Sequence, residues 1–479
     1  KQPNNLEYVF DADGLLTEVL DKNGNAITLT YSGTLLDTIT DQALRVIQFS
    51  HSGDRLQSVT APGGIEASFN VDANADLTQI TDPRGNAYAF TYDGASHRMK
   101  TLTDRKGNQV MALTYDGEGR VETQTNADGK VTTYTYGTRT CAIRPPSGND
   151  VSHTFDASYN QTAVTDGANG RAAFTFDSDG KRISAQDKKE KEVEFSYDDN
   201  GNLERFTNRG GNAISATYNE YNLAQSTTDA LGNTTQMTYD GNGNLLTVKD
   251  PLNGVFTMTY NGDGQPLSRS YPNGNTTFFT YNGQGLVASI TDPLGNETTF
   301  EYDAAGRLIQ TCYPTTDPSG KGTGYDANGN VTRRTDRMGI VNEYTNDNND
   351  SVLTATLDVG GIAAVTQYTY NSRGQLTKMT DAGGGESLTT YDDDGNVETV
   401  TNPDGVVTTY LYDARNRLTS IKDAAGHAVT YAYDANGNVL SETNAMGNTW
   451  TYTYDDQDRL IQMKDPLGAE TSFTYDALD

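Results

Sequence analysis

Histidine and cysteine are common at catalytic and metal centres, and this sequence has few of either. The four histidines lie in different parts of the chain, at His51, His97, His153 and His427. None has another histidine or a cysteine at the spacing of a metal site. Cys141 and Cys312 are far apart and form no CxxC pair, which excludes a zinc ribbon and a disulfide framework. The motifs GxSxG, HExxH and the P-loop are also missing. We therefore predict no catalytic, cofactor-binding or metal-binding residue and no enzyme activity.

Two acidic segments resemble calcium loops, at residues 11–14 (Asp-Ala-Asp-Gly) and 392–396 (Asp-Asp-Asp-Gly-Asn). An EF-hand loop needs a glutamate at its twelfth position, and neither segment has one. A tight turn also offers too few oxygen atoms for a Ca²⁺ shell of about six to eight ligands. The carboxylate of a turn aspartate accepts hydrogen bonds from the backbone that follows it. We predict that these aspartates shape turns.

Tyrosine is the third residue type with a possible chemical role, because exposed aromatic rings on a sheet can stack on sugars. The tyrosines recur every 21 residues, however, beside a leucine or valine that follows shortly after. Such a fixed phase favours a structural ladder of cross-strand pairs over glycan binding. The anchors of the two regular runs are Tyr197, Tyr218, Tyr239, Tyr260, Tyr281 and Tyr302, and then Tyr370, Tyr391, Tyr412, Tyr433, Tyr454 and Tyr475.

The rest of the chain follows the same period less strictly. After Tyr302 the next anchor is Tyr325. Asn346 then stands at the position that tyrosine occupies in the regular repeats, which we call the tyrosine slot. We expect a single array over residues 1–479, with irregular repeats in 1–196, regular repeats in 197–302 and 370–475, and an irregular connection in 311–369. The looser N-terminal anchors are Phe10, Tyr31, Phe49, Phe69, Tyr92, Tyr115, Tyr136, Phe155 and Phe176.

Each repeat predicts a β-hairpin followed by a second turn. In residues 449–454, aromatic residues alternate with threonine, which is typical of a strand. Residues 455–458 form a polar turn, and the apolar residues of 460–463 form the returning strand. The Asp-Pro-Leu-Gly of residues 465–468 is the second turn, in which glycine adopts a positive φ. No stretch keeps helical periodicity, so we predict an all-β fold.

Neighbouring hairpins must pair, since one hairpin cannot bury its apolar face alone. About 23 units give an antiparallel ribbon about 220 Å long and about 20 Å wide. Such a ribbon twists, and we expect it to wind into a spiral whose edges cover each other. Its area suffices for half a shell or an open spiral rather than a closed cage. The prolines Pro314 and Pro318 predict weakened strand pairing in residues 311–325.

Charge and hydropathy exclude several function classes. The chain has 35 Lys and Arg against 64 Asp and Glu, a net charge of −29. This balance argues against binding nucleic acid or an anionic membrane, and turn chemistry explains the excess of aspartate. No apolar run is long enough to span a membrane. Because the chain begins and ends inside a repeat, we expect it to be part of a longer protein.

The phrase Y-D-x-x-G-[NR]-[LV], followed by [DN]-P-x-G-N, resembles the YD repeat, also called the RHS repeat. Residues 302–308 (YDAAGRL) and 433–439 (YDANGNV) match it closely, and the resemblance covers nearly all of the chain. It implies a wound β-ribbon that forms a hollow shell, as in bacterial Rhs polymorphic toxins, the BC part of insecticidal toxin complexes and teneurins. In the bacterial toxins the shell contains a toxic C-terminal domain.

The resemblance implies a secreted or cell-surface bacterial protein. Its partners would be a toxin domain or flanking segments of the same polypeptide, and a component of a secretion system. The cleavage signature DPxGxxGG of the family is missing, because Asp465-Pro466-Leu467-Gly468 does not continue into Gly-Gly. We therefore carry over no catalytic residue. The alternative is an extracellular adhesion or spacer protein that binds glycans or protein partners.

Overall fold

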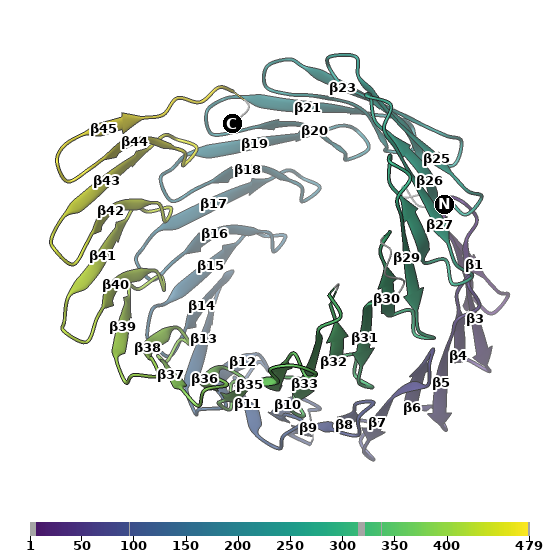
Figure 1. Ribbon diagram of the computed structural model, residues 1–479, viewed down its shortest axis with the longest axis horizontal. Helices are drawn as coiled ribbons and strands as arrows, with labels where there is room; N and C mark the ends of the chain where they lie inside the picture. The colour runs from purple at the N-terminus through teal and green to yellow at the C-terminus, as the bar shows by residue number, and fades with distance from the viewer. Residues whose placement is uncertain (1–5, 95, 315–320, 337, 478–479) are drawn as a thin grey trace. The chain divides into compact units, whose positions relative to one another are not determined.

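The computed structural model describes residues 6–94, 96–314, 321–336 and 338–477, and these residues form strands and turns without a helix. The all-β prediction is therefore confirmed. No helix in this part of the chain is long and apolar enough to cross a membrane. The 45 strands belong to one continuous sheet (Figure 1).

The strands of the N-terminal half are β1 (Glu7–Phe10), β2 (Leu16–Leu20), β3 (Ala26–Ser32), β4 (Leu35–Thr40), β5 (Val46–Ser52), β6 (Arg55–Ala61), β7 (Ile65–Val71), β8 (Leu77–Thr81), β9 (Ala87–Tyr92), β10 (Met99–Thr103), β11 (Gln109–Tyr115), β12 (Val121–Asn126), β13 (Val131–Gly137), β14 (Thr140–Arg144), β15 (Val151–Phe155), β16 (Gln161–Thr165), β17 (Arg171–Phe176), β18 (Arg182–Gln186), β19 (Glu192–Tyr197), β20 (Leu203–Thr207), β21 (Ala213–Tyr218) and β22 (Ala224–Thr228). Those of the C-terminal half are β23 (Thr234–Tyr239), β24 (Leu245–Lys249), β25 (Val255–Tyr260), β26 (Pro266–Ser270), β27 (Thr276–Tyr281), β28 (Val287–Thr291), β29 (Glu297–Tyr302), β30 (Leu308–Cys312), β31 (Lys321–Tyr325), β32 (Val331–Thr335), β33 (Val341–Asn346), β34 (Val352–Leu357), β35 (Ala364–Tyr370), β36 (Leu376–Thr380), β37 (Glu386–Tyr391), β38 (Val397–Thr401), β39 (Val407–Tyr412), β40 (Leu418–Lys422), β41 (Ala428–Tyr433), β42 (Val439–Thr443), β43 (Thr449–Tyr454), β44 (Leu460–Lys464) and β45 (Glu470–Ser472).

Strands β23, β24 and β25 illustrate the repeating register. Strand β23 pairs antiparallel with β24, and Met237 lies opposite Val248. The register then shifts by a bulge, so that Tyr239 at the end of β23 lies opposite Leu245. Strand β24 pairs with β25 without a bulge. Most repeats contain one bulged and one regular strand pairing, although β13 pairs with β14 without a bulge. The bulge strengthens the local twist of the sheet.

Two five-residue turns complete most repeats, and we number their positions 1 to 5. The hairpins β3–β4, β5–β6 and β13–β14 instead have two-residue connections. In the first turn, which follows the tyrosine, Asp240 at position 1 donates its backbone N–H to the carbonyl of Asn244 (2.9 Å). Its own carbonyl accepts from Gly243 at position 4 (3.0 Å), and its Oδ1 accepts from the backbone N–H groups of Asn242 and Asn244. The second turn, residues 250–254, has the same bonds. The predicted turn role of the aspartates is confirmed.

The bulge identifies the residue that occupies each tyrosine slot. Asn346 lies at the bulge of β33, opposite Val352, as the spacing predicted. The prediction was wrong for two N-terminal anchors. The bulges of β5 and β7 fall at His51 and Val71, two residues after Phe49 and Phe69 respectively. The aromatic ring misled the alignment there because the slot itself holds a histidine and a valine.

The predicted weak pairing concerns β30 and β31. Among the described residues, Gln310 lies opposite Gly322 and Thr311 lies opposite Lys321, and the weakened pairing stays a prediction. Pro314 is the last described residue before this gap, and Pro318 lies outside the described residues.

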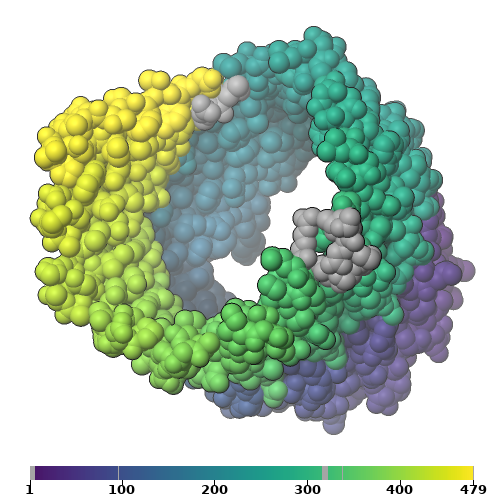
Figure 2. All heavy atoms as spheres, viewed as in Figure 1, coloured from purple at the N-terminus to yellow at the C-terminus, as the bar shows by residue number. Residues whose placement is uncertain are grey.

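The chain divides into two compact units. Unit 1 contains residues 1–108, 217–227 and 234–366, and unit 2 contains residues 109–216, 228–233 and 367–479. Within each unit two stretches of ribbon, which we call the first and the second pass, lie edge to edge (Figure 1). Figure 2 shows the second pass of unit 1, in green, against its first pass, in purple and blue.

Burial within the ribbon is shallow. Ala163 and Ala355 are the buried apolar residues among those described, and no large side chain there is completely enclosed. A single-layered sheet of this kind has no thick apolar core to stabilise it. Its stability must depend more heavily on strand pairing, turn hydrogen bonds and contacts between the passes.

Candidate functional site

The tyrosine slots connect each hairpin to the previous one. The hydroxyl of Tyr260 donates to the carbonyl oxygen of Leu245 (2.8 Å), the residue that lies opposite Tyr239 at the preceding bulge. The bond thus spans β24 and β25, and burial raises the pKa of the Tyr260 hydroxyl. Nine other predicted anchors make the same bond: Tyr197, Tyr239, Tyr281, Tyr302, Tyr391, Tyr412, Tyr433, Tyr454 and Tyr475.

The two remaining predicted anchors, Tyr218 and Tyr370, end β21 and β35 at the same place in the repeat. In several repeats the arginine at position 5 of the first turn lies over the ring of the next anchor. The Cζ atom of Arg417, for example, is 4.6 Å from the centre of the Tyr433 ring. The tyrosines therefore contact their own ribbon through both the ring and the hydroxyl. Sequence spacing located the rings, but the hydroxyl bond was missed, although the preference for tyrosine over phenylalanine in these slots is a signal for it.

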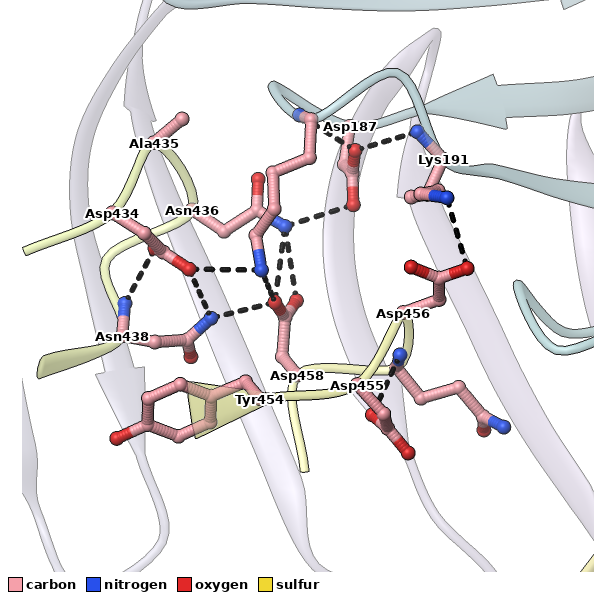
Figure 3. Close-up of polar contacts among 12 residues, drawn as sticks. Asp187, Lys191, Asp434, Ala435, Asn436, Asn438, Tyr454, Asp455, Asp456 and Asp458 are labelled. Atoms are coloured by element: carbon pink, nitrogen blue, oxygen red, sulfur yellow. Dashed lines mark hydrogen bonds and ion pairs between the residues drawn. The ribbon is translucent and has the colours of Figure 1, made fainter. Parts of the chain in front are cut away.

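A cluster of polar side chains in unit 2 lies where turns of its two passes meet, and we call it clamp 2 (Figure 3). Asp458, from the second pass, is at its centre. Its carboxylate accepts hydrogen bonds from Lys189 (2.7 Å) and Arg209 of the first pass. The side-chain amides of Asn436 (3.0 Å) and Asn438 (2.6 Å), both from the second pass, donate to the same carboxylate.

Two further carboxylates extend clamp 2. Lys189 also pairs with Asp434 of the second pass at 2.8 Å. Arg209 pairs with Asp187 of its own pass at 3.2 Å, and Asn436 donates to the same aspartate at 2.8 Å. Each cation therefore contacts two aspartates, and each aspartate has donors from both passes.

Unit 1 contains the same arrangement, which we call clamp 1. Asp350 of its second pass accepts from Arg84 (2.7 Å) and Arg105 (2.5 Å) of the first pass. The amides of Asn328 (3.1 Å) and Asn330 (2.6 Å) complete its shell, as Asn436 and Asn438 do for Asp458. The outer carboxylates are also present, because Arg84 reaches Asp326 (3.4 Å) and Arg105 reaches Asp82 (2.8 Å). The two clamps use the same positions of corresponding turns.

Electrostatics favours the charged form of the clamp aspartates. Burial by itself would raise the pKa of Asp458, but the hydrogen bonds from Lys189, Arg209 and the two asparagines lower it to about 2. In the same way the pKa of Asp350 lies below its ordinary value. Burial lowers the pKa of Lys189, but its bonds to Asp434 and Asp458 outweigh this effect and raise it.

A smaller contact repeats this chemistry elsewhere in unit 2. Asp166 of the first pass pairs with Lys188 (2.6 Å) and with Arg415 of the second pass (2.8 Å). Desolvation opposes ionisation of Asp166, but the bonds from Lys188 and the backbone hold its pKa at about 2.

Asp350 and Asp458 owe their central place to an unusual turn residue. Both stand at position 4, where most turns have glycine, and both have a positive φ, of 69° and 64° respectively. Aspartate tolerates this conformation better than most residues, but it is still a costly choice. The sequence analysis missed the clamps, and an aspartate in the glycine position is the signal that could have found them.

The clamps hold no group suited to acid–base or nucleophilic chemistry, because their central carboxylates are fully paired with cations and amides. Among the described residues, no cluster of three or more His, Cys, Asp or Glu could hold a metal ion. Asp11 and Asp392 cap the backbone of their own turns. The clamps can fasten one edge of the ribbon to another.

Comparison with known proteins gives two family matches. The Teneurin YD-shell model matches residues 158–319, and the RHS Repeat model matches residues 72–109, 391–428 and 433–470. Together these segments cover more than half of the chain. Both models describe structural repeats, which points to a structural role. No curated protein matches the chain in sequence.

Among solved structures, the chain is similar to the TcdB2-TccC3-Cdc42 protein, with a TM-score of 0.51 and 14% identity. That alignment covers 99% of this chain and 34% of the other one, so the chain spans about a third of the length of its structural relative. It also matches TcdB2-TccC3-TEV (TM-score 0.49, 12% identity, 96% and 37% coverage). The Tc holotoxin pore of Photorhabdus luminescens matches with a TM-score of 0.48, 12% identity and 96% and 37% coverage. At this identity the first match shows a shared fold.

Proposed function

Because the chain is built from repeats of the YD (RHS) family, we propose that it is a wall segment of a shell enclosing a toxin domain of the same polypeptide. In this proposal the chain itself is not an enzyme, and the complete protein is secreted or displayed at a bacterial surface. The chemistry of the toxin lies in a part of the polypeptide outside residues 1–479.

The observation that carries this proposal is the occurrence of the same clamp in both units. A container must keep its contents in and proteases out, so neighbouring passes of its wall must be joined. Backbone pairing cannot join them, because the passes meet through turns and not through strands. The paired aspartates, cations and amides of clamps 1 and 2 provide that join.

The proposal is tested by limited proteolysis of the full-length polypeptide that contains these residues. We expect the toxin segment to survive a broad-specificity protease while the wall is intact. It should be digested faster in a variant carrying both Asp350→Asn and Asp458→Asn. The matched control is Asp456→Asn, which removes only an exposed pair with Lys191 and should leave digestion unchanged.

Two results would contradict the proposal. The first is that the segments outside the array are digested at the same rate when the wall is folded as when it is unfolded. The second is that the segments of the full-length polypeptide outside residues 1–479, when they are expressed alone, do not harm bacterial cells. Either result would favour a spacer or adhesion protein instead.

A further inference from the structure

The turn between β7 and β8, residues 72–76, has a second carboxylate where other turns have a hydrogen-bond donor. Its backbone bonds are those of an ordinary first turn. Asp72 donates its N–H to the carbonyl of Asp76 (2.9 Å), and Asp72 Oδ1 accepts from the N–H groups of Asn74 (2.8 Å) and Asp76 (3.0 Å). Strand β8 separates this turn from the turn of residues 82–86, which belongs to clamp 1. The turn therefore lies on the opposite edge of the ribbon, away from the contacts of clamp 1.

In many first turns the side chain at position 5 donates to the second carboxylate oxygen of position 1. Asn244 donates its Nδ2 to Asp240 Oδ2 (2.9 Å), and Arg120 donates its Nε to Asp116 Oδ2 (2.8 Å). These bonds satisfy the oxygen that the turn backbone leaves unused. In the turn between β7 and β8, position 5 is Asp76, and an ionised carboxylate only accepts hydrogen bonds. The shared turn geometry therefore places two carboxylates side by side.

Asp76 is buried, with 6% of its surface exposed. Its Oδ1 is 2.9 Å from the Nδ1 of His97, which belongs to the next first turn of the ribbon. Its Oδ2 is also buried and has no hydrogen-bond partner among the described residues. The bonds that Asp72 accepts there both use its Oδ1, which leaves its Oδ2 unused as well. A buried carboxylate oxygen without a partner is unfavourable, so a positive group between the two carboxylates would stabilise the turn.

The cationic side chains that reach this turn are used elsewhere. Arg55 of β6 donates to the backbone carbonyls of Asp72 and Ala73. His97 lies on the other oxygen of Asp76, and 57% of its side chain is exposed. Neither side chain lies between the two carboxylates.

The hydroxyl of Tyr92 is also used elsewhere, because it donates to the carbonyl of Leu77 (2.9 Å). Burial raises the pKa of Tyr92, and the charges of Asp76 and Asp72 raise it further. Two carboxylates that act on the same hydroxyl lie close to each other. This supports the side-by-side placement that the turn geometry gives them.

The number and type of the ligand atoms select the ion. Carboxylate oxygens favour a hard cation, but Ca²⁺ takes about six to eight oxygen ligands and structural zinc takes about four protein ligands. Two carboxylates supply neither set. Mg²⁺ is bound through one or two carboxylates and keeps several of its water molecules. Residues 73–75 of the turn are exposed, so water can reach the outer side of the pair.

We propose that Asp72 and Asp76 form a binding site for a hydrated Mg²⁺ ion. Asp72 Oδ2 and Asp76 Oδ2 are the protein ligands, and water completes the octahedral shell. His97 is a positioning residue, since it holds Asp76 by the other carboxylate oxygen. The ion takes the role that the amide of Asn244 and the guanidinium of Arg120 have in their own turns.

Mn²⁺ is the probe for this site, because it accepts the same oxygen ligands and broadens the proton NMR signals of nearby groups. The folded chain is titrated with MnCl₂, and the ring signals of the four histidines are followed, with His97→Gln used for assignment. The His97 signal should broaden saturably, and added MgCl₂ should restore it. Asp76→Asn gives this turn the residue that Asn244 provides elsewhere, and its amide would donate to Asp72 Oδ2. The Mn²⁺ concentration that half-broadens the His97 signal should then rise at least about tenfold.

Asp13→Asn is the matched control. It removes the same charge from an exposed aspartate in another first turn of the first pass, so it should broaden His97 like the unaltered chain. Thermal unfolding without Mg²⁺ should show Asp76→Asn to be at least as stable as the unaltered chain, because its turn is then fully paired.

Three results would overturn the proposal. The first is that the His97 signal of the unaltered chain does not broaden saturably or is not restored by Mg²⁺. Together with a more stable Asp76→Asn, this result would assign a shared proton to the pair. The second is that folded Asp76→Asn needs no more Mn²⁺ than the unaltered chain. The third is that Asp13→Asn weakens the broadening as much as Asp76→Asn does.

Discussion

At the scale of single residues, one aspartate at the fourth position of a turn determines each clamp. Asp350 and Asp458 adopt a positive φ, which is easier for glycine. In this position each carboxylate contacts two cations and two side-chain amides. Ion pairs of this kind stabilise when every partner is satisfied and destabilise when one is removed. The clamp residues are therefore sensitive positions on an otherwise tolerant surface.

Replacing Asp458 by asparagine tests this sensitivity. Asparagine keeps the turn conformation but removes one of the two carboxylate partners of Lys189 and one of the two of Arg209. We expect the free energy of unfolding to fall by about 2 kcal/mol at neutral pH, in line with the lowered pKa of this carboxyl. Urea unfolding followed by tyrosine fluorescence measures the change. Asp456→Asn serves as the control, since its exposed pair should contribute less than about 1 kcal/mol. Equal effects of the two substitutions would refute the special role of Asp458.

At the scale of the elements, the hairpin is the building block and the tyrosine hydroxyl connects one hairpin to the next. The bond from Tyr260 to the carbonyl of Leu245 starts at one bulge and ends opposite the previous one. It adds a side-chain link where the bulge interrupts the backbone ladder. This explains why the slot prefers tyrosine to other aromatic residues in the regular runs.

The substitution Tyr260→Phe removes that link and keeps the ring. We expect a loss of about 1 kcal/mol in the free energy of unfolding, because a partly buried carbonyl loses its donor. Hydrogen exchange should accelerate most in β24 and β25. Tyr221→Phe is the matched control, since Tyr221 lies on an exposed turn and should change stability by less than about 0.5 kcal/mol. Unchanged exchange in β24 and β25 would show that the hydroxyl bond does not hold the hairpins together.

At the scale of the whole molecule, most of the aspartate carboxylates that give the chain its negative charge have hydrogen-bond or ion-pair partners. Most aspartates cap turns, and those at the contacts between passes are paired with cations. Several of the latter have a lowered pKa, among them Asp82, Asp166, Asp350, Asp434 and Asp458. The organisation of residues 1–479 as a single array stays a prediction.

The lowered pKa values predict a loss of stability in acid. These carboxyls bind protons more weakly in the folded chain than in the unfolded chain, whose value is 3.8. Their contribution is therefore fully present above about pH 5 and is lost as the pH falls from about 4 toward 2. Urea unfolding at a series of pH values measures this slope. The double variant Asp166→Asn and Asp458→Asn should flatten it, and an unchanged slope would assign the acid sensitivity to other groups.

The features that could be predicted from the sequence are those that depend on residues close together in the chain. The hairpin depends on alternation within one strand and on turn residues a few positions apart, so the all-β fold, both turns and the slot of Asn346 were predictable. Phe49 and Phe69 were assigned wrongly because an aromatic residue next to the slot was a stronger signal than the histidine and valine within it.

The sequence by itself determined the repeating unit, its strands and the reason for its acidity. Only the tertiary structure decided which turns meet. Asn23 contacts Asn244, 221 residues away, whereas Arg209 contacts Asp458, 249 residues away. No local rule fixes these separations, because they depend on small twists accumulated over many strand pairs. The clamps exist where that accumulated twist brings two distant turns together and places cations of the first pass beside carboxylates of the second pass.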